Sequence, residues 1–149
     1  MNEKPASWND CMEKNMSLDA RKDMLKSRSL IETALHRIAF VNKDMNENTA
    51  NYIFEDYYTS IMELLEAMAI IQGYKVLNHV CLGFFLRDVL KKDSLFRIFD
   101  ELRYKRNSLV YYGKRMQFEE AKMSIEKSRR MAEELQKLVD VPDKNADQA

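Results

Sequence analysis

Apolar residues recur at helical spacing along most of the chain, and polar or glycine-containing breaks divide this pattern into six segments. Ser17 and Ser94 are suitable N-caps, while Gly73 and Gly113 are suitable helix ends. No stretch shows the period-two alternation of a half-buried strand, so no strand is predicted. The pattern predicts an all-α bundle of five to six helices, over about residues 8–15, 17–42, 49–73, 77–92, 94–113 and 118–139.

The fifth predicted helix has a charged side chain in the middle of its apolar face. Leu95, Phe99, Leu102, Arg106 and Leu109 follow one another at steps of four, three, four and three, which places them on one inward stripe. A desolvated arginine costs several kcal/mol unless it is paired. Arg106 therefore implies a partner group, a second subunit or a bound phosphate.

The charge is unevenly distributed, although the formal net charge is zero. Residues 44–74 include six acidic residues and no lysine or arginine, whereas residues 87–115 include nine basic and four acidic residues. The basic segment could attract phosphate groups, or it could pair with the acidic third helix. The candidate phosphate-binding or nucleic-acid-binding residues are Arg103, Lys105, Arg106, Lys114 and Arg115.

Three parts of the sequence carry a resemblance to a known family. They are the run Asp56-Tyr57-Tyr58-Thr59-Ser60 with Leu64-Leu65-Glu66-Ala67, the turn Gly73-Tyr74-Lys75 followed by Asn78-His79, and the dipeptide Arg106-Asn107. In this combination the chain resembles HEPN domains, small helical proteins of bacteria and archaea. The resemblance implies a HEPN-like homodimer in which the motif residues of two subunits meet in a cleft, where arginine binds phosphate and histidine takes part in RNA cleavage. It also implies a partner, a minimal nucleotidyltransferase encoded beside it in a toxin–antitoxin pair.

The chain departs from the family motif at one position, where Tyr111 replaces histidine. An unperturbed tyrosine has a pKa of about 10, so presenting its ionised form at neutral pH costs about 4 kcal/mol. The motif residues Arg106, Asn107 and Tyr111 thus make a degenerate catalytic site, with His79 and Tyr112 as accessory candidates. We expect a nucleotide-binding or RNA-binding and interaction module with little or no catalysis. The alternatives are a metal-independent ribonuclease toxin and a purely structural dimer adaptor.

Length and composition add the remaining expectations. The 149 residues suit a single domain, expected over residues 8–140, with disordered tails at residues 1–7 and 141–149. No apolar run approaches the roughly 20 residues that cross a bilayer, and no residue spacing indicates a metal or cofactor site. No apolar signal segment precedes Cys11 and Cys81, so a cytoplasmic protein with reduced thiols is expected, with a disulfide as the alternative.

Overall fold

The computed structural model describes residues 3–41 and 43–147, with side chains described as far as Val139. The predicted all-α fold is confirmed, because helices dominate the described chain. A short π-helix and two short strands accompany six α-helices in this part of the protein. The elements are α1 (Trp8–Glu13), β1 (Ser17–Asp19), α2 (Met24–Ala39), α3 (Ala50–Ile71), β2 (Tyr74–Val76), α4 (His79–Phe84), the π-helix η1 (Phe85–Val89), α5 (Asp93–Tyr112) and α6 (Phe118–Asp147).

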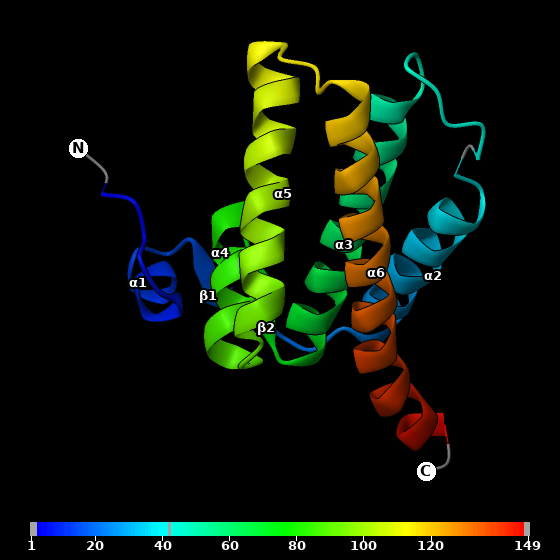
Figure 1. Cartoon of the computed structure of the whole chain (residues 1–149). Coiled ribbons are helices and arrows are strands. Elements are labelled where there is room, and N and C mark those ends of the chain that lie inside the picture. The colour runs from blue at the N-terminus through cyan, green and yellow to red at the C-terminus, as the bar shows by residue number, and fades with distance from the viewer. Residues whose placement is uncertain (1–2, 42, 148–149) are drawn as a thin grey trace.

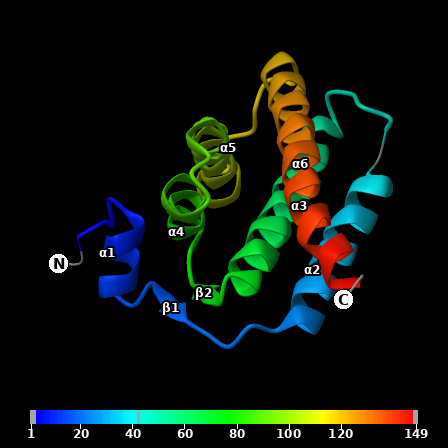
Figure 2. The same ribbon diagram turned by 90° about the horizontal axis from the view of Figure 1, so that it is seen from below.

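Helix α3 is the centre of the fold, as the width of its apolar surface predicts. It packs against α2 on one side and α6 on another, and these three helices form one half of the molecule (Figure 1). Helices α1, α4 and α5 form the other half, which the view from below separates clearly (Figure 2). Phe54, Tyr58, Ile61, Leu64 and Leu65 of α3 are almost completely buried between the two halves.

A two-stranded antiparallel sheet corrects the prediction that the chain contains no strand. Ser17 pairs with Val76 and Asp19 pairs with Tyr74, so that β1 and β2 lie side by side at one end of α3. Strands of three residues are too short to show an alternating sequence pattern. Ser17 is therefore not an N-cap, and α2 begins at Met24, where the Asp23 carboxylate accepts a hydrogen bond from the Lys26 amide.

The predicted fourth helix over residues 77–92 is also corrected. It is divided into α4 and the wider turn of η1, and it ends by Leu90, before Lys91 takes a left-handed backbone conformation with φ of 58°. Gly83 lies where α4 approaches α5, and a Cβ atom there would come within 3.3 Å of the Phe99 ring. Helix α5 begins at Asp93 rather than after a Ser94 cap.

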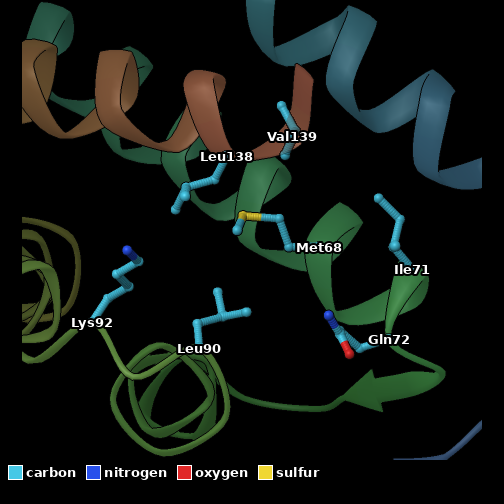
Figure 3. Close-up of a pocket in the computed structure, with 7 residues that line it drawn as sticks. All are labelled: Met68, Ile71, Gln72, Leu90, Lys92, Leu138 and Val139. Carbon is cyan, nitrogen blue, oxygen red and sulfur yellow. The ribbon is translucent and has the colours of Figure 1, made fainter. Parts of the chain in front are cut away.

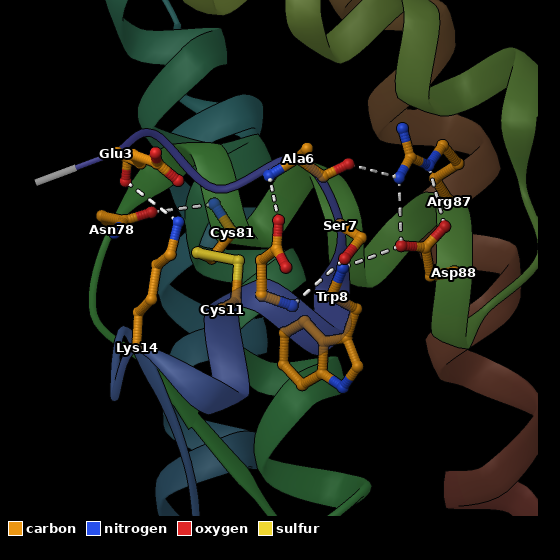
Figure 4. The surroundings of a disulfide bond; sticks show 11 residues. Glu3, Ala6, Ser7, Trp8, Cys11, Lys14, Asn78, Cys81, Arg87 and Asp88 are labelled. Atoms are coloured by element: carbon orange, nitrogen blue, oxygen red, sulfur yellow. Dashed lines mark hydrogen bonds and ion pairs between the residues drawn. A yellow bond between two sulfur atoms is a disulfide. The ribbon is translucent and has the colours of Figure 1, made fainter.

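Cys11 and Cys81 form a disulfide, so the expectation of reduced thiols is wrong (Figure 4). The bond joins α1 to α4 across 70 residues of sequence, and both residues are fully buried. Two hydrogen bonds to η1 support the same attachment, one from the Trp8 amide to the Asp88 carboxylate and one from the Arg87 guanidinium to the Ala6 carbonyl. The N-terminal segment is thereby fastened against α4 and η1.

The two ends of the domain differ in extent from the sequence prediction. Helix α6 continues to Asp147, past the Val139 end predicted from periodicity. At the other end, the Glu3 carbonyl accepts a hydrogen bond from Lys14, within the segment expected to be a tail. Residues 1–2 and 148–149 lie outside the described residues.

Candidate nucleic-acid interface on helix α5

The C-terminal half of α5 carries the residues that the sequence singled out. The helix ends at Tyr112, and Gly113 takes the left-handed conformation with φ of 63°, which confirms it as a helix stop. The amides of Gly113 and Lys114 both donate to the Ser108 carbonyl, so the last turn is closed by backbone hydrogen bonds. This half of the helix leaves three tyrosine side chains well exposed, at 70% for Tyr104, 69% for Tyr111 and 75% for Tyr112.

Arg106 finds aromatic partners rather than a carboxylate. Its guanidinium carbon lies 5.6 Å from the ring centre of Tyr58 on α3 and 5.7 Å from that of Tyr111 on its own helix. Within the described part of the chain it makes no hydrogen bond or ion pair. A cation over an aromatic face gains about 0.5–2 kcal/mol, depending on desolvation. The partner that the inward position demanded is therefore a pair of rings, and the guanidinium N–H groups remain available to an anion.

His79 reaches this cluster from α4, as the sequence allowed. Its Nδ1 atom lies 3.0 Å from the Tyr58 hydroxyl. Burial lowers the pKa of His79, and the positive charges of Arg106 and Arg103 lower it further. Burial likewise raises the pKa of Tyr58. At neutral pH both side chains are therefore uncharged.

The hydrogen bond between these two side chains decides which ring nitrogen of His79 carries its proton. Tyr58 is only 2% exposed, and among the described residues its hydroxyl meets no acceptor other than Nδ1. A buried hydroxyl that fails to donate loses a hydrogen bond's worth of stability. We therefore assign the Tyr58 hydroxyl as donor to Nδ1, which leaves the ring proton on Nε2. In this tautomer His79 is a hydrogen-bond donor, not a base.

An open groove of about 550 Å³ runs beside the exposed tyrosines. Its cations are Lys4, Arg103 and Lys114, and the described residues of its lining include no carboxylate. Arg106 does not line the groove but contacts it through Tyr111. Of the residues predicted from the sequence, the groove brings together Arg103, Asn107, Tyr111, Tyr112 and Lys114.

The other predicted phosphate-binding residues lie elsewhere. Lys105 points towards α6, where it donates to the Ser124 hydroxyl and lies 3.4 Å from the Glu101 carboxylate of its own helix. The guanidinium of Arg115 lies 5.4 Å from the ring centre of Tyr52 on α3. The groove thus uses part of the predicted set.

The alternative interpretation of the basic segment, pairing with the acidic third helix, is wrong for the ion pairs of the described residues. Arg97 and Arg103 pair with carboxylates one turn away on α5, and Lys127 of α6 pairs with Glu101. The α3 carboxylate of Glu63 pairs instead with Arg37 of α2. Three cations of the basic segment, Arg97, Arg103 and Lys105, thus pair along α5, and Glu63 of α3 pairs with α2.

Sequence reasoning missed three members of the site. Tyr58 was named only as part of the run Asp56–Ser60 that carries the family resemblance, and its ring stacks on Phe99 with 6.0 Å between ring centres. Lys4 belongs to the segment that was expected to be a tail, and Tyr104 stood beside Arg103 without being selected. Tyr104 and Tyr111 are seven residues apart, so helical periodicity places them on the same side of α5. This spacing was the signal that could have identified Tyr104.

Comparisons with protein-family models, with curated proteins and with solved structures gave no match. Within the described ranges, no group of three or more histidine, cysteine, aspartate or glutamate side chains is arranged to hold a metal ion. None of the helices described is both long and apolar enough to cross a membrane. The features of this surface that indicate a function are the groove, Arg106 and the His79–Tyr58 pair.

The lowered pKa of His79 predicts a pH-dependent stability. Between its ordinary pKa of 6.5 and the lower value in the fold, the unfolded chain binds a proton that the folded protein does not. The stability contribution of neutral His79 is therefore present above pH 6.5 and is lost as the pH falls. We expect the melting temperature to decrease between pH 7.5 and pH 5.5, and to decrease less in His79→Gln.

The matched control for this measurement is His36→Gln, which removes the other histidine of the chain. It should retain the pH dependence of the wild type in thermal melts followed by circular dichroism. Equal slopes for the wild type and His79→Gln would contradict the assignment of a depressed pKa to His79.

Proposed function

We propose that this chain is a nucleotide-binding or RNA-binding and protein-interaction module that binds single-stranded RNA along the α5 groove. The observation that carries the proposal is the composition of the groove, where exposed tyrosine rings alternate with cations. Its described lining includes no carboxylate, although Arg103 also pairs with Asp100 one turn earlier on α5. Aromatic faces stack on bases without regard to sequence, and cations follow the phosphate backbone. A surface that only contacted solvent would gain nothing from three exposed rings on one side of a helix.

The side chains divide the work of binding. Tyr111 and Tyr112 offer ring faces for bases, while Lys4, Arg103 and Lys114 offer positive charge for phosphates. Arg106 is held beside Tyr111, with its N–H groups free for a phosphate oxygen. His79 adds no positive charge to these interactions, because burial first, and then the charges of Arg106 and Arg103, lower its pKa.

The test is binding of a fluorescently labelled single-stranded RNA across a salt series. We expect affinity to fall with salt at a log–log slope on the order of −2 to −3, as three or four phosphate contacts imply. Arg103→Ala and Arg106→Ala should each weaken binding about tenfold. Lys137→Ala is the control, because Lys137 lies on α6 and pairs with Glu134. Equal losses in all three variants would show nonspecific charge, and no binding at low salt would favour the structural adaptor.

A ribonuclease is the second candidate, because an imidazole and an arginine do meet at this site. Two points favour binding without cleavage, namely our assignment of the His79 ring proton to Nε2 and the tyrosine at the motif position of the family. In the same incubations, the labelled RNA should therefore stay intact with the wild type. Cleavage that Arg106→Ala abolishes would instead support the ribonuclease.

We further propose that two copies associate through α5 in a two-fold dimer with both Arg106 side chains near the axis. The support is the exposure of Tyr104 and Val110 on this helix, which leaves Tyr111 and Tyr112 to the RNA, together with the resemblance to HEPN proteins. Tyrosine and arginine are the residue types that dominate protein interfaces. Light scattering at tens of micromolar, a concentration on the order at which weak dimers form, should give the mass of a dimer. A monomer would contradict the shared cleft.

The same resemblance supports a minimal nucleotidyltransferase as the protein partner. An interaction of this kind would use exposed side chains of the module rather than its core. Size-exclusion chromatography of a mixture with such an enzyme should show one complex, and separate elution of the two proteins would count against it.

A further inference from the structure

A second cavity lies at the opposite end of α5 from the tyrosine groove. It is an open pocket of about 190 Å³, bordered by the end of α3, the residues that follow η1, and α6 (Figure 3). Met68, Ile71, Leu90, Leu138 and Val139 provide an apolar wall, and Gln72 and Lys92 are the polar residues of its lining. Helix α5 has 20 residues, so about 30 Å separates its two ends. Nothing in the proposed RNA-binding function uses this cavity.

The size of the cavity limits what it can hold. An apolar cavity of about 150 Å³ can take a benzene ring, whereas drug-sized ligands need roughly 300 Å³ or more. The volume therefore suits an apolar group of about six to eight heavy atoms. Met68 and Val139 are 7% and 2% exposed, so the wall is part of the packed core and is formed before any ligand arrives.

The charge at the rim limits the chemistry further. Lys92 extends towards the space between Leu138 and Met68 (Figure 3). Within the described ranges Lys92 forms no ion pair, although other cations of the same segment do, among them Arg87 and Arg97. Among the side chains described, which end at Val139 on α6, the lining includes no carboxylate. An ammonium at the edge of an apolar space is complementary to a ligand that carries an anionic head and an apolar tail.

We propose that this cavity binds a small carboxylic acid with an apolar tail of about five or six carbons, such as hexanoate. The tail lies against Met68, Leu90 and Leu138, and the carboxylate pairs with Lys92 at the rim. Gln72, which is exposed, lies across the pocket from Lys92 (Figure 3).

The experiment is calorimetric titration of the full chain with three probes that share one tail: hexanoate, hexanol and hexylamine. For ligands of this size we expect a hexanoate Kd on the order of 1 mM or lower. Hexanol should bind about tenfold more weakly, and hexylamine should not bind at 20 mM. Equal affinity for hexanoate and hexylamine would overturn the proposal, as would no binding of hexanoate at 20 mM.

Two variants locate the site. Lys92→Met should reduce the affinity for hexanoate to that for hexanol, whereas Lys91→Met, which removes the adjacent exposed charge, should leave it unchanged. Gln72→Trp, at an exposed position, should block the opening and abolish binding, with thermal melts to confirm that each variant is folded. Binding that survives both Lys92→Met and Gln72→Trp would overturn the proposal. Because the cavity and the groove lie at opposite ends of α5, RNA affinity should be the same with and without hexanoate.

Discussion

Replacing both cysteines, as Cys11→Ala with Cys81→Ala, is expected to lower the free energy of unfolding by about 4 kcal/mol. The disulfide spans 70 residues, and closing so long a loop removes much of the entropy of the unfolded chain. Alanine is apolar, so placing it at these two fully buried positions leaves no polar side-chain atom without a partner. Urea denaturation of the oxidised wild type and of the double variant measures the difference.

Reduced wild-type protein is the control for this comparison. Treatment with dithiothreitol during unfolding should bring its stability close to that of the double variant. A wild type whose stability is unaffected by the reductant, and whose unfolded chain shows two free thiols on titration, would contradict the disulfide.

Removing both terminal tyrosines of α5, as Tyr111→Ala with Tyr112→Ala, is expected to weaken RNA binding at least about 30-fold. Stacking of a base on an aromatic side chain is worth about 1–3 kcal/mol, and both rings are largely exposed in the groove. The same exposure means that the core loses little when they are removed. Fluorescence anisotropy with the labelled RNA measures the loss.

Phe40→Ala is the matched control, because Phe40 is an aromatic residue with 86% exposure that follows α2, outside the groove. It should bind RNA as the wild type does. If the double tyrosine variant also binds normally, the rings have no role in recognition and the groove loses its main argument.

The helices of this fold were predictable because their signals are local. Periodic apolar positions predict the bounds of α3 and α5 within a few residues. Gly113 ends α5 because glycine, which has no Cβ atom, adopts the left-handed conformation without strain. The strands were not predictable, since Ser17–Asp19 and Tyr74–Val76 have meaning only as a pair. The disulfide depended on bringing residues 11 and 81 together in space, which no local pattern specifies.

The candidate site was predictable only in its α5 part. Arg103, Asn107 and Tyr111 lie one turn apart on a single helix, so their spacing alone gathers them. Tyr58 and Lys4 come from other segments, and their place in the site follows from the packing of α3 and from the attachment of α1. His79 was a candidate whose reach depended on how α4 lies on α3, and the hydrogen bond to Tyr58 settles it.

Because Phe99 stacks on Tyr58, one buried ring contributes both to the core and to the candidate site. Phe99 is fully buried and lies so close to Gly83 that a Cβ atom there would come within 3.3 Å of its ring. The same ring stacks on Tyr58, the tyrosine that contacts Arg106 and His79. Substitutions at Gly83 and Phe99 would therefore change the affinity for RNA and the melting temperature together. A new RNA-binding specificity is better engineered at the exposed tyrosines, because replacing them leaves the stack of Phe99 on Tyr58 in place.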